Sequence, residues 1–187
     1  MKVIQLYTNE KKLIEKAAQG DRKAQRRLYD KHAGKMLSVC RQYISPIETA
    51  EEIMLNGFFK VFTKLETFNH EGSFEGWVRR IMIRECLNFL RKKDPFKWSS
   101  EIDEGKFEDE PEEEAEDVPL DQIQQCIDQL PDGYKSVFVM YVIDGLKHHE
   151  IATMLGISEN TSKSQFRKAR LLLQEEINEI KKKRYEA

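Results

Sequence analysis

A run of acidic residues in the middle of the chain divides this sequence into two parts. Residues 94–119, DPFKWSSEIDEGKFEDEPEEEAEDVP, carry 12 Asp and Glu against 2 Lys and Arg, with three prolines and no helical spacing of apolar residues. Like charges at this density repel one another, and the segment has too little apolar surface to form a core. The sequence therefore predicts a flexible acidic linker over 94–119 between two domains, 1–93 and 120–187.

The net charge of −2 conceals this uneven distribution. Residues 1–93 carry 19 Lys and Arg against 11 Asp and Glu, and residues 120–187 carry 10 of each. The first domain is thus basic although the whole chain is slightly acidic, so contact with a polyanion remains possible. The linker itself has two interpretations: a solubilising spacer, or a nucleic-acid mimic that occupies a basic channel of a partner.

Composition and motifs exclude several classes of protein. Few Gly and Pro among abundant Glu, Lys, Leu and Arg favour an all-α fold. No run of 18 apolar residues and no signal peptide occurs, so we expect a cytoplasmic protein. Cys40, Cys86 and Cys126 are widely spaced and are expected to be buried thiols. His149-Glu150 begins a zinc-protease HExxH, but Thr153 replaces its second His. No phosphate loop, metal cluster or nucleophile–base pair appears, so we expect neither a cofactor nor enzymatic activity.

The first domain shows two successive helical patterns. Asp21 can cap a helix that Ser45-Pro46 ends, and a second helix follows with a broad apolar face. The first pattern comprises Ala24, Leu28, Met36, Leu37, Cys40 and Ile44; the second comprises Ala50, Ile53, Met54, Gly57, Phe58, Val61, Phe62 and Leu65. Leu55 and Phe59 lie off the second face. They are either additional core residues or an exposed pair that docks another protein.

The segment ETFNHEGSFEGWVRRIMIRECLNFLRKK predicts a loop followed by a third helix. Glu71-Gly72-Ser73 has the composition of a turn that ends in a helix cap. Arg80, Arg84, Asn88 and Arg91 follow at helical spacing and form a basic stripe. The stripe is either an ordinary solvated face or, together with Phe68, Phe74 and Trp77, a surface for single-stranded DNA with charges for phosphates and rings or an apolar pocket for an unstacked base.

The second domain contains a helix-turn-helix pattern. Leu130-Pro131 opens a helix with the apolar positions Val137, Phe138, Tyr141 and Val142, and Asp144-Gly145 closes it. A helix from about His148 to Leu155, a turn at Gly156 and a cap at Ser158 come next. We expect Ala152 and Gly156 to let the two helices of the motif approach closely.

The last helix has two faces of opposite character. Ser162, Phe166, Ala169 and Leu173 recur at helical spacing and are expected to pack inward. Lys163, Ser164, Arg167, Lys168 and Arg170 lie on other sides. A helix whose first turns carry Lys, Ser and Arg can enter a major groove, where it contacts base edges and phosphates. An amphipathic helical hairpin without DNA contact is the alternative.

The order of these parts resembles the extracytoplasmic-function (ECF) sigma factors, a two-domain class of the sigma-70 family of bacterial RNA polymerase subunits. The resemblance rests on TAEEIMLNGFFKVFTKLETF, FNHEGSFEGWVRRIMIRECLNFLRKK, a variable linker, and LPDGYKSVFVMYVIDGLKHHEIATMLGISENTSKSQFRKAR. The last segment is similar to sigma factors of Bacteroidetes-type bacteria. The resemblance implies a sigma region 2 domain of three or four helices at 1–93 and a region 4 helix-turn-helix domain at 120–187.

What the resemblance implies is a function in transcription initiation: binding core RNA polymerase, directing it to promoters and helping to melt the minus-10 element. It assigns contact with the beta-prime clamp to Glu51, Glu52, Leu55, Asn56, Phe59 and Lys60. It assigns minus-10 recognition to Phe68, Asn69, His70, Ser73, Phe74, Trp77, Arg80, Arg84 and Asn88. The C-terminal domain would sit on the beta flap and read the minus-35 element through Lys163, Ser164, Arg167, Lys168 and Arg170. The linker would thread through the polymerase, and an anti-sigma factor is a typical partner.

The sequence departs from the family pattern at four positions. Leu55-Asn56 stands where members usually carry Gln and an acidic residue, which affects the expected clamp contact. Arg84 stands where most have Asn, so either the minus-10 element differs or phosphate contact replaces base reading there. Ser162 stands where the family often has Val.

Two further functions are compatible with the residues alone. A stand-alone helix-turn-helix regulator would use only the C-terminal domain and bind duplex DNA without polymerase, usually as a dimer. A helical adaptor would bind protein partners and leave its basic faces solvated.

Overall fold

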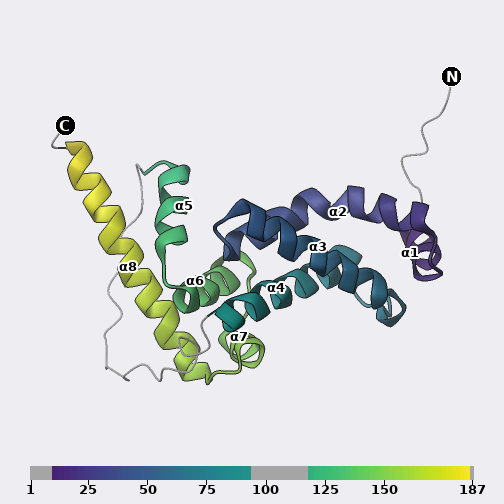
Figure 1. Cartoon of the computed structure of the whole chain (residues 1–187). Coiled ribbons are helices and arrows are strands. Elements are labelled where there is room, and N and C mark those ends of the chain that lie inside the picture. The colour runs from purple at the N-terminus through teal and green to yellow at the C-terminus, as the bar shows by residue number, and fades with distance from the viewer. Residues whose placement is uncertain (1–9, 94–117, 186–187) are drawn as a thin grey trace. The chain divides into compact units, whose positions relative to one another are not determined.

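The computed structural model describes residues 10–93 and 118–185, which form helices, turns and loops without a strand (Figure 1). The all-α class expected from the sequence is confirmed. The chain forms two compact units, with the division between Phe89 and Leu90. The predicted linker lies almost entirely outside the described residues.

The N-terminal unit contains five helical elements. They are α1 (Glu10–Ala18), α2 (Arg22–Tyr43), α3 (Ile47–Thr63), the short 3₁₀ turn η1 (Leu65–Thr67) and α4 (Phe74–Lys93). α1 folds back against α2, and α2 packs against α3 (Figure 1). The predicted cap at Asp21 is present, since its carboxylate accepts the backbone N–H of Lys23 at 2.8 Å. Pro46 precedes α3, as expected of a residue that cannot continue α2.

The core of the N-terminal unit follows the predicted apolar faces. Buried side chains from each helix include Ile14, Leu28, Met36, Tyr43, Ile53, Phe58, Val61, Val78 and Met82. Each large apolar side chain that is fully buried contributes roughly 1.5–3 kcal/mol. Gly57 is where α3 comes close to α4: a Cβ there would clash with the thioether of Met82.

The C-terminal unit is built around one long helix. α5 (Leu120–Gln129), α6 (Asp132–Phe138), the π-helical turn η3 (Val139–Ile143) and α7 (His148–Leu155) precede α8 (Glu159–Tyr185). α8 packs against α5, α6 and α7. Residues buried in this unit include Ile127, Val137, Met140, Ile151, Leu155, Ala169 and Leu173.

The helix-turn-helix has the predicted boundaries. α7 ends at Leu155, and Gly156 takes the left-handed conformation with φ 69°. Ser158 caps α8 by accepting the N–H of Thr161 at 2.9 Å. Ala152 is buried, as expected. Nothing approaches the position of a Cβ at Gly156 within 4 Å, so this glycine serves the turn and not the close approach of the helices.

One predicted face is correct only in its first part, since Val137 is buried and Phe138 is half-buried as expected. Tyr141 and Val142 were expected to be apolar contacts of the helix that Pro131 opens, but they are 39% and 54% exposed. The helix changes to π geometry at Val139, where Asp144 N–H donates to Val139 C=O five residues back. The additional residue in this turn rotates the following side chains away from the core, so a pattern of 3.6 residues per turn does not apply there.

The three cysteines are buried free thiols, as expected. Among the described residues, no helix has both the length and the apolar character needed to cross a membrane. Within the same ranges, no three His, Cys, Asp or Glu side chains gather in a way that could hold a metal ion.

Candidate nucleic-acid interfaces

The loop before α4 is held in a defined conformation by local hydrogen bonds. His70 and Gly72 have positive φ values of 62° and 82°, which reverse the chain. Asn69 Oδ1 accepts the N–H of Glu71 at 3.2 Å, and Ser73 Oγ accepts the N–H of Gly76 at 3.0 Å. Ser73 is thus the predicted cap of α4. The polar residues of the loop are exposed on a backbone that is already ordered.

The rings next to this loop form one aromatic cluster. Phe68 lies 5.3 Å from Phe74, 5.4 Å from Trp77 and 4.9 Å from His70, measured between ring centroids. Phe68 and Phe74 are buried, and Trp77 is half-buried. The two phenylalanines therefore offer an apolar surface beneath the loop and not free ring faces, which favours the pocket interpretation of the two made from the sequence.

A pocket of about 340 Å³ opens beside this cluster. The loop supplies one side through Phe68, His70, Gly72, Ser73 and Phe74. The other side comes from α1 and α2 and was not predicted: it comprises Glu10, Lys11, Ile14, Lys31 and His32. The apolar repeat of EKKLIEKAA was the only signal for α1 in the sequence.

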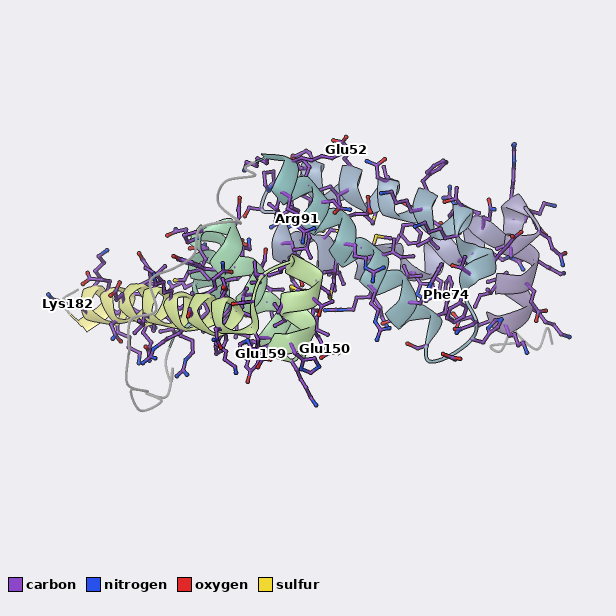
Figure 2. All side chains as sticks on the ribbon, turned by 90° about the horizontal axis from the view of Figure 1, so that it is seen from below. Glu52, Phe74, Arg91, Glu150, Glu159 and Lys182 are labelled. Carbon is purple, nitrogen blue, oxygen red and sulfur yellow. The ribbon has the colours of Figure 1, made fainter. Side chains whose placement is uncertain are left out.

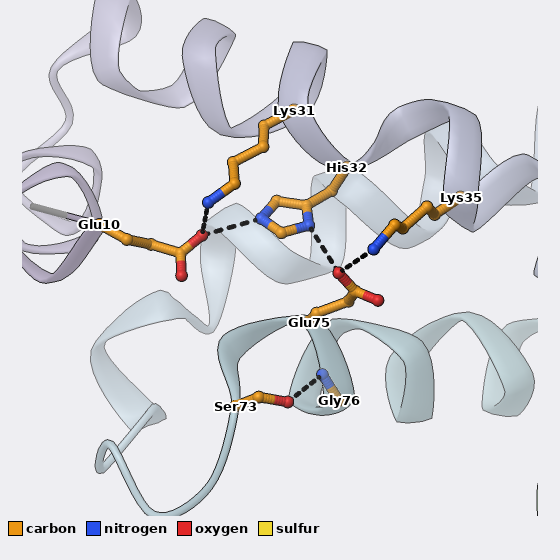
Figure 3. Close-up of polar contacts among 7 residues, drawn as sticks. All are labelled: Glu10, Lys31, His32, Lys35, Ser73, Glu75 and Gly76. Atoms are coloured by element: carbon orange, nitrogen blue, oxygen red, sulfur yellow. Dashed lines mark hydrogen bonds and ion pairs between the residues drawn. The ribbon is translucent and has the colours of Figure 1, made fainter. Parts of the chain in front are cut away.

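A buried histidine joins the three helices around this pocket (Figure 3). His32 of α2 lies between two carboxylates, with Nε2 3.2 Å from Glu10 Oε1 and Nδ1 3.9 Å from Glu75 Oε2. The His32 ring also packs edge-on against Phe74. The contacts therefore link α1, α2 and the start of α4.

Lysines flank both carboxylates. Lys31 Nζ lies 2.6 Å from Glu10, and Lys35 Nζ lies 2.8 Å from Glu75. The hydrogen bond from Lys35 lowers the pKa of Glu75. Partial burial opposes ionisation of Glu10, but the hydrogen bonds and charges of Lys31 and His32 outweigh it and lower the Glu10 pKa. Both groups are therefore anions at neutral pH.

The predicted polar stripe lies along the exposed side of α4. Arg80, Arg84 and Asn88 are all exposed and follow at intervals of four residues. This stripe begins one turn after the aromatic cluster, because Trp77 and Arg80 are three residues apart. The same helix thus carries the aromatic residues next to the loop and the charges of the stripe.

The outer face of α3 is apolar as well as polar. Leu55 and Phe59 are 53% and 70% exposed, so they are not additional core residues. Glu51, Glu52 and Asn56 are exposed on the same helix. Lys60 forms an ion pair with Glu85 of α4 at 2.6 Å, so its ammonium group is held close to α4.

The two faces of α8 have the character predicted from the sequence. Ser162, Ala169 and Leu173 are buried and Phe166 is half-buried; Gln165 is also buried, which was not predicted. The polar and basic residues lie away from that face: Lys163 is exposed, and Ser164, Arg167, Lys168 and Arg170 are half-buried. Glu159 and Lys182 lie near the two ends of this helix (Figure 2). Glu159 is paired with Lys163 at 2.8 Å.

A histidine connects the two helices of the helix-turn-helix. His148 Nδ1 lies 3.0 Å from Ser162 Oγ, and the His148 ring stacks on Tyr141 at 4.5 Å between centroids. Burial lowers the pKa of His148, the positive charge of Lys163 lowers it further, and Glu159 opposes the shift. The imidazole is therefore neutral at pH 7 and bonds the hydroxyl of a fully buried serine.

These features define a class of protein. A helix-turn-helix with a polar and basic outer face stands in one unit, and a basic helix beside an ordered loop with a pocket stands in the other. This combination is typical of proteins that act on DNA in transcription.

Comparison with known proteins identifies the family. The family model of Sigma-70 region 2 matches residues 28–96, and the family model of Sigma-70, region 4 matches residues 120–173. The chain is 26% identical over 185 residues to the ECF RNA polymerase sigma factor SigW of Bacillus subtilis, covering 91% of this chain and 97% of that protein. It is 24% identical over 180 residues to the sigma-E factor of Haemophilus influenzae, covering 90% and 95%.

Solved structures share the fold. The sigma factor RpoE of Bartonella quintana, in complex with the anti-sigma factor NepR, matches with a TM-score of 0.55 at 17% identity, over 82% of this chain and 96% of that one. CnrH, in complex with the cytosolic domain of CnrY, matches with a TM-score of 0.53 at 19% identity, over 90% and 97%.

The chain belongs to the sigma-70 family and is an ECF RNA polymerase sigma factor. It binds core RNA polymerase and promoter DNA and directs initiation, and it is not an enzyme.

Proposed function

We propose that the polar and basic side of α8, which faces away from its buried residues, reads the minus-35 element through Lys163, Ser164, Arg167, Lys168 and Arg170. The separation of the two faces of α8 carries this proposal: buried and basic residues occupy different sides of one helix. Ser158 and Glu159 begin the helix directly after the turn at Gly156, so Lys163, Ser164 and Arg167 lie in its first turns, the part of a recognition helix that contacts base edges.

The loop and α4 capture the melted minus-10 strand. An extruded base would enter the pocket beside Phe68, His70 and Ser73, and the polar stripe of Arg80, Arg84 and Asn88 would follow the phosphates. The buried contacts of Phe68 and Phe74 support this role, because a pocket ordered in advance reduces the entropy cost of binding.

The outer face of α3 docks on the beta-prime clamp of the polymerase. An exposed Leu55 and Phe59 next to Glu51, Glu52 and Asn56 provide the apolar centre and polar rim that protein interfaces use. Because Lys60 is paired with Glu85 of α4, we expect it to orient the edge of this face and not to supply a free charge to the clamp.

With domain boundaries at 93 and 119, each domain would have its own binding function. Residues 1–93 would form region 2, 120–187 would form region 4 on the beta flap, and the acidic segment between them would cross the polymerase in a basic channel. The protein would act in the cytoplasm with the polymerase. An anti-sigma factor would hold it inactive, a proposal supported by the solved complex of the sigma factor RpoE with the anti-sigma factor NepR.

The decisive experiment combines purified chain, core polymerase and a library of genomic fragments from the source organism, followed by sequencing of transcript starts. We expect one set of promoters with a shared minus-35 and minus-10 element, absent when either component is omitted. Failure of every fragment, with an active control sigma factor alongside, would contradict the proposal.

Arg167→Glu tests the minus-35 assignment. We expect it to reduce initiation at these promoters about tenfold or more, because it removes a DNA contact and adds a repulsive charge. Binding to core polymerase should be unchanged. Lys182→Glu makes the same charge change near the other end of α8 and should have little effect. Loss of core binding by Arg167→Glu would mean that the DNA face is misassigned.

A further inference from the structure

A second pocket lies between α1 and α2, and it is lined by cations. Its volume is about 260 Å³. Lys12 and Lys16 reach it from α1, and Lys23 and Arg27 reach it from α2. Leu13, Ala24 and Asp21 complete the lining. None of these residues was singled out by the sequence motifs as a binding residue, and none belongs to the interfaces described above.

The helical hairpin fixes this arrangement. Gly20, with φ 86°, turns the chain between the two helices, and Gln25 Nε2 donates to Ala17 C=O at 3.1 Å. The buried side chains of Ile14, Ala17, Ala24 and Leu28 pack at the junction. Each pair of cations is spaced four residues apart on its helix, so both members point to the same side. The hairpin therefore places four positive groups around one opening.

Three of the acidic groups on this hairpin are already engaged. Asp21 is the N-cap of α2 and accepts the N–H groups of Lys23 and Ala24. Asp30 pairs with Arg26 at 2.8 Å, and Glu10 contacts Lys31 and His32. Within the described residues, none of the four cations of the pocket forms an ion pair, and Asp21 is the one carboxylate in the lining, so the pocket keeps a net positive charge.

Such an arrangement is unfavourable in the absence of an anion. Like charges four residues apart on a helix destabilise it by roughly 0.2–0.5 kcal/mol per pair, and here two such pairs share a pocket. A phosphate group would remove this repulsion and could accept hydrogen bonds from several cations at once. The pocket is thus chemically matched to phosphate oxyanions.

The position of the pocket suggests where such phosphates come from. α1 separates it from the pocket beside the minus-10 loop: Lys11 and Ile14 line the loop pocket, and Lys12, Leu13 and Lys16 line the basic one. The two pockets thus share α1, and a DNA strand whose base enters the loop pocket would have the hairpin on the other side of that helix. Neighbouring phosphates along the strand are the nearest source of anions.

We propose that Lys12, Lys16, Lys23 and Arg27 bind backbone phosphates of the single strand that continues from the captured base. This inference rests on the proposed single-strand capture by the loop and α4. It adds a contact surface on the α1–α2 hairpin, which keeps the melted strand on the protein without reading its sequence.

The test uses holoenzyme assembled from the full chain and core polymerase on a promoter with a pre-melted minus-10 region. Lys12→Gln/Lys23→Gln should lower the slope of log affinity against log salt, by about 0.7 for each phosphate that the variant no longer binds. Lys182→Gln/Lys183→Gln removes the same charge from exposed positions in the last turn of α8 and serves as the control. A hairpin variant with an unchanged slope would overturn the proposal.

Two titrations of the free chain distinguish strand phosphates from a small phosphate ligand. Backbone amide shifts near Lys23 are followed with a single-stranded 12-mer and with inorganic pyrophosphate. The proposal expects the 12-mer to bind and the hairpin variant to weaken it. Pyrophosphate binding that the variant abolishes, with 12-mer binding unaffected, would assign the pocket to a free phosphate compound and overturn the strand proposal.

These experiments also distinguish a failure of the hairpin proposal from a failure of the proposed function on which it rests. A wild-type holoenzyme that initiates at no promoter contradicts the proposed function, and the 12-mer titration then decides about the pocket alone. A holoenzyme that initiates normally in the hairpin variant, with an unchanged salt slope, contradicts only the hairpin contact.

Discussion

Ser162 departs from the family pattern, and its structural environment gives a physical reason for the polar residue. The serine is fully buried, where an unpaired hydroxyl would be unfavourable, and His148 of the neighbouring helix supplies its hydrogen bond. His148 in turn stacks on Tyr141, which η3 places next to it. The serine, the histidine and the tyrosine therefore depend on one another.

This arrangement makes the stability of the C-terminal unit pH dependent. The pKa of His148 is lowered from 6.5 in the folded protein, so the unfolded chain takes up the proton first as the pH falls. The stabilising contribution of neutral His148 is complete above the unfolded pKa and is lost as the pH falls below 6.5 toward the folded pKa. We expect the full chain to lose protection of α7 and α8 amides in hydrogen exchange, corrected for intrinsic rates, over that window.

The matched variants are His148→Gln and His149→Gln. His148→Gln should abolish this pH dependence, whereas His149→Gln, at the exposed neighbouring position, should retain it. An equal pH dependence in wild type and His148→Gln would show that another group is responsible.

A buried ion pair provides a second test at single residues. Lys135 of α6 is 2% exposed, and its Nζ lies 2.6 Å from Asp128 Oδ1 of α5. Asp128→Ala should destabilise the C-terminal unit by up to about 3 kcal/mol, because it removes a carboxylate partner of a buried ammonium. Lys135→Met should cost much less, since it removes the charge and keeps the volume. Hydrogen exchange of α5 and α6 amides in the full chain measures both, and an equal cost for the two variants would contradict the expectation.

At the scale of the element, one side of α3 packs in the core and another side is free to dock a partner. Ile53, Phe58 and Val61 bury one side, and Leu55 and Phe59 remain exposed on another. Phe59→Ser should therefore change the free energy of unfolding by no more than about 0.5 kcal/mol. It should weaken binding to core polymerase by at least about 1 kcal/mol, roughly fivefold.

The control for Phe59→Ser lies on the same helix. Ile47→Ser removes an apolar side chain that is 46% exposed in the first turn of α3, about three turns from Phe59. Fluorescence titration with labelled core polymerase compares the two. Equal loss of affinity in both variants would mean that general apolar exposure, and not the Leu55–Phe59 face, governs binding.

How far a helix could be predicted depended on whether its ends are marked locally. The ends of α7 and the start of α8 were predicted because Gly156 and Ser158 act through their own backbone geometry and hydrogen bonds. α1 and α5 were missed because they are only 9 and 10 residues long, and helices this short are stabilised mainly by packing, here against α2 and α8. The π turn at Val139 was missed because nothing in the local sequence indicates a change of helical period.

At the scale of the whole molecule, the two units are joined by a strongly acidic segment. Two recognition surfaces on one chain raise the effective concentration of the second once the first is bound. A protease site placed in the 94–117 segment should leave initiation intact before cleavage. After cleavage, affinity of the holoenzyme for promoter DNA should fall roughly 100-fold or more. Unchanged affinity would show that each unit is held independently by the polymerase.

The sequence by itself determined the helical class, the two domains, the uneven charge and the boundaries of the helix-turn-helix. Caps, turn residues and charge density act over a few neighbouring residues, so they can be recognised without knowing the fold. The tertiary structure decided that Phe68 and Phe74 are buried beneath the loop, that Leu55 and Phe59 are exposed, and that α1 brings Lys12 and Lys16 to the pocket that Lys23 and Arg27 also line. Each of these depends on which helix packs against which, and that is fixed by contacts between residues distant in the chain.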